Sequence, residues 1–406
     1  MGSDSARRGP RGGRRPLWSA VRAVEIPQMN VAEHAAALRR WLAGNADALD
    51  EYRQRSPSGI ETEVRHDRGL MRLLYDAGWG RMGWPEAAGG LGGPAVLRAL
   101  LYDELGAAGV EVPEAYVMIE TCASLLVEYG KPIAAQHLGA FLRGEEIWAQ
   151  GFSEPEAGSD LAQLRTRAVA TDKGFRLSGQ KIWTSMGQFS RWAIVLARTG
   201  GPESAHRGLT MLWVDLDAPG VTVRPIEASN GRAEFAEMFF DDVAVPADAV
   251  IGEVGGGWAA AMYLLQYERG MYAWLRQSVL RRRLREAAER AEGPIGPAAA
   301  AAFGRAIQAT AMLRARSRRT VRRLSGGENP GPEISIDKAL LGAAEQATYE
   351  ALRLLYWTGM ASGSDPRSMT LREEWFYSRA TTIFGGAVDV QRDIVAERVL
   401  GLPRVH

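Results

Sequence analysis

The chain has 406 residues, of which 46% are apolar and 24% are charged, and its formal net charge is +1. A chain of this length and composition buries enough apolar surface to fold without disulfides or a structural metal. Its single cysteine, Cys122, excludes an internal disulfide, and no uncharged apolar run is long enough to cross a bilayer. We therefore expect a cytoplasmic protein without a membrane span.

Residues 1–28 form an Arg-rich leader with few acidic residues. A segment of this composition cannot bury a core, so it is predicted to be disordered. Its shortage of acids is also compatible with a transit peptide, but it lacks the apolar stretch of a secretory signal. The rest of the chain divides into three blocks by the period of its apolar positions.

The first block, residues 29–148, repeats apolar residues with the 3.6-residue period of amphipathic helices. A glycine-rich segment that begins Trp-Pro-Glu, residues 84–93, interrupts this pattern as a loop. The sequence therefore predicts an N-terminal helical domain. Its clearest helical stretches are residues 31–41, 68–76, 95–105 and 119–129.

The second block, residues 149–255, alternates short β-type runs with turn residues, and this spacing predicts a β-sandwich or barrel. The runs are residues 165–170, 175–178, 192–197, 209–214, 221–225 and 238–240. In the third block, residues 256–406, the helical period returns and predicts a C-terminal four-helix bundle. The expected fold class is thus α+β and multi-domain: helices, then a β domain, then helices.

Most patterns that carry chemistry on their own are absent from this sequence. It has no zinc-ligand spacing, no P-loop and no nucleophile elbow, so a metal site is not expected. Two Arg-dense segments, residues 281–290 and 314–323, favour solvated helix faces or oligomer contacts over nucleic-acid binding, since acids alternate with arginines in the first. If the chain is an enzyme, a bound organic cofactor is expected to supply its chemistry.

Three segments point to such a cofactor. The polar segment 150–160 carries hydroxyls and backbone N–H groups that could bind a carbonyl-rich ring or a phosphate, although an ordinary loop fits equally well. In segment 179–185, Trp183 could stack on a flat heterocycle while Thr184 hydrogen-bonds its edge, and a buried strand tryptophan is the alternative. The third segment is 383–392, which contains a Gly-Gly pair.

The order and spacing of these segments resemble the acyl-CoA dehydrogenase family of flavoproteins, from about residue 30 to residue 404. The resemblance implies that FAD lies between the middle and C-terminal domains, with Ser159 near the pyrophosphate and thioester and Arg269 near the CoA moiety. The cofactor-binding residues that it implies are Gln150, Phe152, Ser153, Trp183, Thr184, Ser185, Gly385, Gly386 and Asp389.

The same resemblance locates the catalytic base. Many members of the family carry a glutamate just before the second glycine of the C-terminal loop, but here that position is Gly385, which cannot accept a proton. A second subgroup places its base on the first long helix of the C-terminal domain, in a pattern that ends Glu-Arg. Glu268 and Arg269 match this pattern, so Glu268 is the candidate base, against the alternative of an ordinary surface carboxylate.

The activity implied is α,β-desaturation of an acyl-CoA thioester, by proton abstraction at Glu268 and hydride transfer to flavin N5, with electron-transfer flavoprotein as acceptor. Desaturation of a carrier-protein-bound acyl group and flavin monooxygenation are alternatives, as is a partner subunit that completes another chain's site. Ala387 replaces a common threonine, and an Arg-x-x-Phe-Gly segment frequent in the family is missing. An α2β2 hetero-oligomer therefore stands beside a homotetramer or homodimer.

Overall fold

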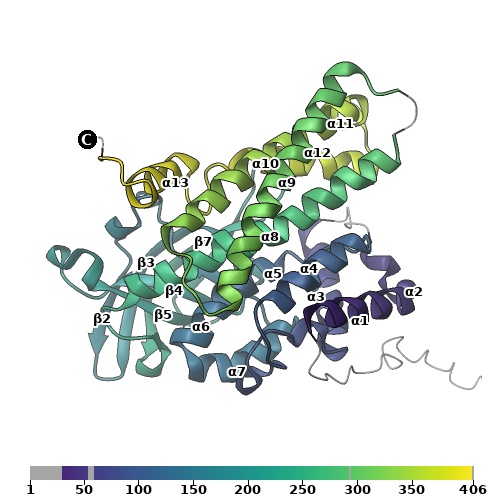
Figure 1. Ribbon diagram of the computed structural model, residues 1–406. Helices are drawn as coiled ribbons and strands as arrows, with labels where there is room; N and C mark the ends of the chain where they lie inside the picture. The colour runs from purple at the N-terminus through teal and green to yellow at the C-terminus, as the bar shows by residue number, and fades with distance from the viewer. Residues whose placement is uncertain (1–29, 54–58, 292–293, 405–406) are drawn as a thin grey trace, which may run out of the picture.

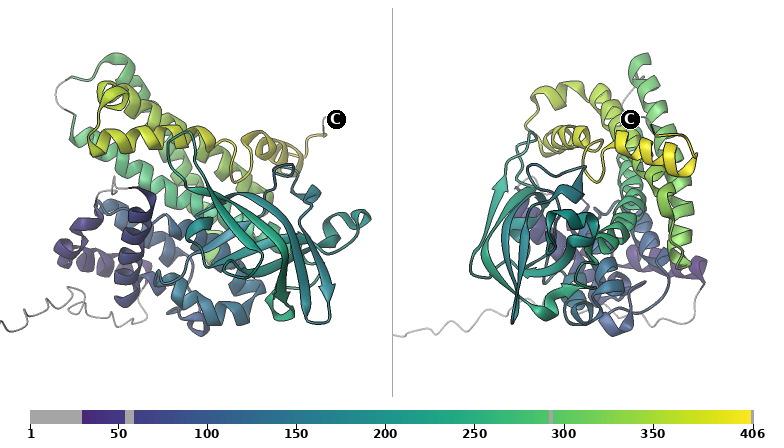
Figure 2. Two further views of the ribbon diagram at one scale, coloured as in Figure 1. Left: turned by 180° about the vertical axis from the view of Figure 1, so that it is seen from behind. Right: turned by 90° about the vertical axis from the view of Figure 1, so that its left-hand side faces the viewer.

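The computed structural model describes residues 30–53, 59–291 and 294–404, so the leader predicted over residues 1–28 lies outside the described residues. A β-sheet lies beside the N-terminal helices, and the C-terminal helices lie above them (Figure 1). Seen from behind, the sheet and the N-terminal helices lie side by side, and the C-terminal helices lie across both (Figure 2). The predicted order of helical, β and helical domains is confirmed.

The N-terminal helices contain the four predicted helical stretches. Asn30 begins the first of them with a capping box, in which its side chain accepts from the backbone N–H groups of Ala32 and Glu33 at 3.0 Å each. A π-helical turn, η5 (Ile119–Ala123), joins two of the helices and packs against the long helix that opens the C-terminal domain. The α-helices are α1 (Val31–Gly44), α2 (Ala46–Leu49), α3 (Ile60–Asp76), α4 (Val96–Ala107), α5 (Ala115–Met118), α6 (Ser124–Tyr129) and α7 (Lys131–Leu142).

The middle domain is an eight-stranded sheet in the order β6-β7-β3-β2-β4-β5-β8, with β1 paired in parallel to β4. Each of the six predicted β runs falls on a strand, and the structure adds β1 and β8. The strands are β1 (Trp148–Gly151), β2 (Arg167–Thr171), β3 (Gly174–Ser185), β4 (Trp192–Arg198), β5 (Leu209–Asp215), β6 (Val221–Ile226), β7 (Phe235–Pro246) and β8 (Val250–Ile251).

Helix α8 (Gly257–Glu289) is the element that joins the three parts of the molecule. Residues 270–280 of this helix are all buried, because N-terminal helices pack on one side and C-terminal helices on the other. The Trp274 indole donates to the Ala99 carbonyl at 2.7 Å and ties α8 to α4. The remaining C-terminal helices are α9 (Pro297–Ser325), α10 (Ile334–Leu355), α11 (Trp357–Ser362), α12 (Pro366–Ala380) and α13 (Val388–Ile394).

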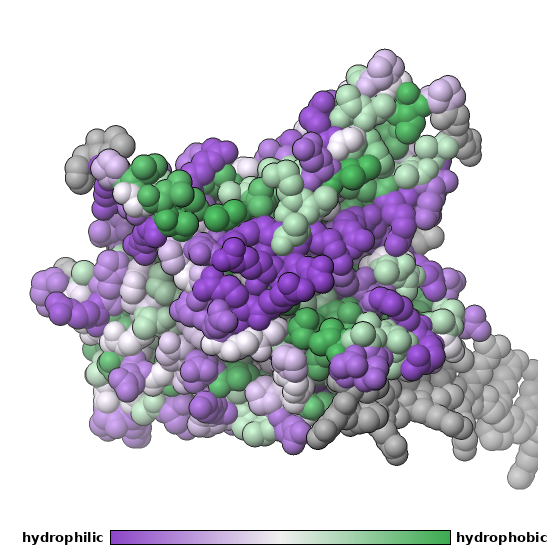
Figure 3. Space-filling model, viewed as in Figure 1, coloured by the Kyte–Doolittle hydropathy of each residue, from purple (hydrophilic) through white to green (hydrophobic). Residues whose placement is uncertain are grey.

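The surface carries apolar side chains around α13, near the C-terminal end of the described chain (Figure 3). Four large apolar residues there are exposed, and we refer to them together as the C-terminal apolar patch: Ile383, Val390, Leu400 and Leu402. Contiguous exposed apolar groups mark interaction sites more often than scattered ones do. Among the described helices, none combines the length and the apolar character that crossing a membrane requires.

Candidate active site

Glu268 lies where α8 meets the sheet. Its side chain is half-buried, and its Oε2 accepts a hydrogen bond from Gln150 Nε2 on β1 at 3.2 Å. The two residues are 118 positions apart in the sequence. The resemblance assigned Gln150 to the cofactor, whereas the structure places its amide against the candidate base. A neutral donor of this kind orients a carboxylate without neutralising its charge.

The Gly385–Gly386 turn lies directly beside this carboxylate. It connects α12 to α13, and both glycines have left-handed backbone angles, with φ of +62° and +101°. A Cβ atom added at Gly385 would stand 3.0 Å from Glu268 Oε1. The carboxylate of Glu268 therefore borders the position from which a side chain at residue 385 would project.

Unpaired polar atoms gather at the second glycine of the turn. Gln391 is fully buried, and neither atom of its amide has a hydrogen-bond partner among the described residues. Arg269 Nε is buried and unpaired in the same way. A Cβ atom at Gly386 would lie 2.5 Å from Gln391 Nε2 and 3.3 Å from Arg269 Nη2. Buried donors without partners are costly, so this cluster is suited to a ligand that supplies acceptors.

Segment 150–160, the first segment predicted to bind the cofactor, is anchored by a buried ion pair that the sequence analysis did not identify. Lys181 of β3 is fully buried, and its Nζ lies 2.8 Å from Glu154 Oε1 and donates to the Phe152 carbonyl at 3.0 Å. Glu154 also accepts the backbone N–H groups of Arg165 and Thr166, at 2.6 and 2.9 Å. The sequence signal was a lysine within segment 179–185, in a chain that has few lysines.

Burial and pairing act in opposite directions on these two groups. Burial lowers the pKa of Lys181 to about 8, against the pull of Glu154. Burial also works to raise the pKa of Glu154, but the Lys181 ammonium and the hydrogen bonds to the carboxylate outweigh it, so that this pKa is lowered. The pair therefore holds the backbone at Phe152, next to Ser153, in a fixed position.

Trp183 stands on a β-bulge. The register of β3 against β7 shifts between Lys181 and Thr184, and Trp183 has a φ of +60°, which is unusual for a bulky residue. The bulge leaves the indole 57% exposed, in edge contact with Phe235 at 6.0 Å between ring centroids. The alternative of a buried strand tryptophan is therefore wrong, and a large flat surface is available for stacking.

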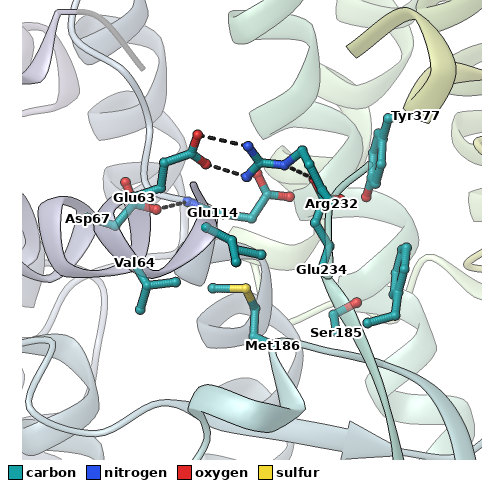
Figure 4. A pocket seen from close by; sticks show the side chains of 11 residues that line it. Glu63, Val64, Asp67, Glu114, Ser185, Met186, Arg232, Glu234 and Tyr377 are labelled. Atoms are coloured by element: carbon teal, nitrogen blue, oxygen red, sulfur yellow. Dashed lines mark hydrogen bonds and ion pairs between the residues drawn. The ribbon is translucent and has the colours of Figure 1, made fainter. Parts of the chain in front are cut away.

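The two hydroxyls that follow Trp183 have different surroundings. Thr184 is fully buried and its Oγ1 has no partner among the described residues. Ser185 is half-buried and opens into a cavity between α3, β3, β7 and α12, which Tyr377 and Met186 also line (Figure 4). On another wall of this cavity, Arg232 pairs with Glu63 through both terminal guanidinium nitrogens. Ser185 is thus the hydroxyl that a ligand can reach directly.

Two further predicted residues lie apart from Glu268. Ser159 is exposed in the bend that follows β1. Asp389 is also exposed, at the start of α13, where it pairs with Arg392 at 3.1 Å. Phe152 is buried and Ser153 half-buried above the Lys181–Glu154 pair. The structure therefore brings Gln150, Glu268, Arg269 and the Gly385–Gly386 turn together, with Trp183 and Ser185 on the neighbouring strand end.

A helical domain, a sheet domain and a second helical domain thus meet around a half-buried carboxylate. Three family models match the chain in this order: acyl-CoA dehydrogenase N-terminal domain over residues 39–145, middle domain over 149–243 and C-terminal domain over 255–400. The chain belongs to the acyl-CoA dehydrogenase family, and it is an oxidoreductase acting on CH–CH groups.

Named relatives and solved structures agree with this assignment. Acyl-CoA dehydrogenase IpdE1 of Mycobacterium tuberculosis is 35% identical over 381 residues, which cover 92% of this chain and 98% of the relative. A structure described as the Tcur3481-Tcur3483 steroid ACAD is 27% identical with a TM-score of 0.78, covering 92% of this chain and 98% of that one. The ChsE4-ChsE5 complex from Mycobacterium tuberculosis is 26% identical with a TM-score of 0.75, covering 95% of this chain and 100% of that one.

Proposed function

We propose that the chain is an FAD-dependent acyl-CoA dehydrogenase in which Glu268 removes the α-proton of the thioester. The observation that carries this proposal is the contact between Glu268 and the Gly385 turn, because it brings a carboxylate to a position where the chain otherwise has none. Within the described residues this half-buried carboxylate accepts one hydrogen bond, from a neutral donor, which leaves its other oxygen available to accept a proton.

The Gly385–Gly386 turn is proposed to hold the thioester carbonyl. An α-proton of a thioester is weakly acidic, so its removal requires donors aimed at the oxygen on which negative charge develops. A backbone N–H of Gly385 or Gly386 is such a donor, and one donor of this kind contributes roughly 3–4 kcal/mol to stabilising the transition state. Arg269 is proposed to bind the CoA moiety, since its buried guanidinium has an unpaired Nε beside Gly386.

The residues present fit a flavin. An exposed indole offers a stacking surface, Ser185 offers an accessible hydroxyl, and the unpaired amide of Gln391 calls for a partner. FAD, when bound, accepts the hydride equivalent from the β-carbon of the substrate. Phe152, Ser153, Trp183, Ser185 and the Gly385–Gly386 turn are the residues proposed to hold it, with more distant roles for Thr184 and Asp389.

We propose bulky, polycyclic acyl-CoA thioesters as substrates, because a related structure is described as a steroid ACAD. A second, different subunit is proposed to cover the C-terminal apolar patch. This proposal is supported by the 65% exposure of Leu400 and the 70% exposure of Ile383, and by the likeness to the ChsE4-ChsE5 complex. Electron-transfer flavoprotein is the proposed acceptor of the electrons.

Anaerobic titration with a panel of acyl-CoA thioesters, followed by flavin absorbance, tests the function. Linear and steroid-derived thioesters are compared, and the bulky ones are expected to bleach the flavin fastest. Glu268→Gln should retain the yellow colour but lower the bleaching rate by about 10²–10⁴-fold, the usual contribution of a positioned base. Glu289→Gln, at an exposed carboxylate on the same helix, is the matched control and should leave the rate unchanged.

The outcomes separate the proposed function from its alternatives. Equal bleaching rates in the wild type and Glu268→Gln would remove Glu268 as the base. Peroxide formation in air without an acceptor would favour a desaturating oxidase or a monooxygenase. A colourless chain that binds FAD only when produced together with a second subunit would favour the role of a partner subunit.

A further inference from the structure

Lys338 is a fully buried lysine that lies behind the Gly385 turn. It belongs to α10 and is 1% exposed. Its Nζ donates to the Thr381 carbonyl at 2.7 Å and lies 4.6 Å from the centroid of the Phe384 ring. Thr381 is the C-cap of α12, where the helix dipole favours a cation. One ammonium group therefore fastens the start of the segment 381–386 to α10.

The same ammonium group faces Glu268 across Gly385. A Cβ atom at Gly385 would stand 3.6 Å from Lys338 Nζ and 3.0 Å from Glu268 Oε1. Because glycine places no side chain there, the cation and the carboxylate border the same small space. From this arrangement we infer that Lys338 is a positioning residue for the proposed proton transfer, which fixes the Gly385 turn and supplies a positive charge beside the thioester anion that forms there.

The charges around Lys338 support this inference. Glu268 and Arg269 face it from α8, and Glu345 faces it from its own helix. Glu345 is already bound by Arg276, at 2.6 and 3.1 Å. Glu268 is therefore the carboxylate near Lys338 that has no guanidinium bonded to it among the described residues, and it accepts a hydrogen bond from the neutral amide of Gln150.

Titration of Lys338 falls within an accessible pH range. Burial lowers the pKa of Lys338 to about 8, while Glu268 and Glu345 oppose this shift and Arg269 adds to it. The ammonium charge of Lys338 is therefore present at neutral pH. Because the pKa is lowered, this charge is lost as pH rises through about 8. Around Glu268 itself, Arg269 stays charged throughout, and Gln150 and the buried thiol of Cys122 are neutral.

The test measures proton removal without turnover, and it rests on the proposed function. The probe is a 3-thiaacyl-CoA, whose α-proton is acidic and whose anion gives a long-wavelength charge-transfer band when stacked on oxidised flavin. The band is titrated with pH in the holoenzyme. Lys338→Met should move the acidic midpoint of the band upward by about one pH unit, because a nearby cation no longer favours the anion of the probe. Lys173→Met, at an exposed turn, is the control and should not move it.

A second measurement needs no variant of Lys338. In the wild type the band should weaken as pH rises through about 8, because Lys338 loses its charge in this range and no longer stabilises the anion of the probe. Lys338→Arg, which stays charged, should remove this weakening while keeping the acidic midpoint of the wild type. A purely structural role would lower the unfolding temperature of Lys338→Met and leave both midpoints in place.

The results that would overturn the inference differ from those that would overturn the function. If the wild type shows the band, and Lys338→Met shows the same midpoints as the wild type, the role assigned to Lys338 is wrong and the proposed function stands. If the wild type gives neither the band nor bleaching with any thioester, the proposed function fails and the inference fails with it.

Discussion

The two fully buried lysines of this chain have similar environments but different partners. Lys181 and Lys338 are both almost inaccessible, and burial lowers the pKa of each to about 8. Lys181 contacts the Glu154 carboxylate at 2.8 Å, and this carboxylate accepts two further hydrogen bonds, from the backbone N–H groups of Arg165 and Thr166. Lys338 instead donates to a backbone carbonyl and lies over an aromatic ring.

We interpret this difference as a structural role for Lys181 and a role at the proposed active site for Lys338. In a buried ion pair whose members are fully hydrogen-bonded, the two charges compensate each other. The function of such a pair is to hold together the elements that it connects. A buried cation that has no carboxylate bonded to it can still interact electrostatically with a neighbouring charged group. Around Lys338 that group is Glu268, whose one hydrogen bond within the described part of the chain comes from Gln150.

The largest expected effect is on stability, from Lys181→Met. Removal of one member of a buried pair leaves Glu154 uncompensated, and such a change costs about 3–5 kcal/mol in the free energy of unfolding. Urea denaturation of the apoprotein measures it. Lys338→Met should cost clearly less, because no bonded carboxylate is left behind. The double variant Lys181→Met with Glu154→Gln should recover part of the lost free energy of unfolding. Equal losses for Lys181→Met and Lys338→Met would contradict the different roles assigned to the two lysines.

The elements of this fold were predictable because helix and strand periods are local. The stretches 31–41 and 95–105 and the six β runs all lie on elements of the predicted type. The three segments proposed to bind the cofactor could also be selected from the sequence, since each is continuous. Contacts between segments could not be predicted in this way, as shown by the Gln150–Glu268 bond across 118 residues.

Local irregularity explains another part of what the sequence left open. The surroundings of Trp183, Thr184 and Ser185 depend on the bulge in β3, which changes which residues face the sheet interior. A strict alternation of faces cannot show that Thr184 is buried and that Ser185 opens into a cavity. Likewise, nothing in the pattern around Lys338 indicated that its ammonium group reaches the Gly385 turn, because that contact joins α10 to the end of α12.

An intermediate effect is expected from Gly385→Ala, which places a methyl group between the ammonium of Lys338 and the carboxylate of Glu268. The left-handed backbone at this position costs a non-glycine residue roughly 1–2 kcal/mol. The new methyl group would also stand 3.0 Å from Glu268 Oε1 and displace it. We expect lower stability in urea and a flavin reduction rate reduced by at least about tenfold, since small misplacements of a reacting group are costly.

Gly327→Ala is the matched control for this change. Gly327 also has a left-handed backbone, with φ of +73°, but a Cβ atom there meets nothing within 4 Å. It should lose stability to a similar extent and keep the wild-type rate of flavin reduction. If both glycine variants reduce flavin as fast as the wild type, the gap at residue 385 has no part in placing Glu268.

The smallest expected effect is from Trp183→Ala, on the strand that also carries Lys181. The indole is 57% exposed and makes an edge contact with Phe235, so its removal should change the urea midpoint little. Loss of a stacking surface is worth about 0.5–1.5 kcal/mol, which corresponds to a roughly 2- to 12-fold weaker binding of FAD. Fluorescence titration of the apoprotein with FAD measures this change. Lys181→Met should therefore lower the stability of the fold, whereas Trp183→Ala, on the same strand, should lower the affinity for FAD. A large loss of stability in Trp183→Ala would show that the tryptophan at the bulge serves the fold instead.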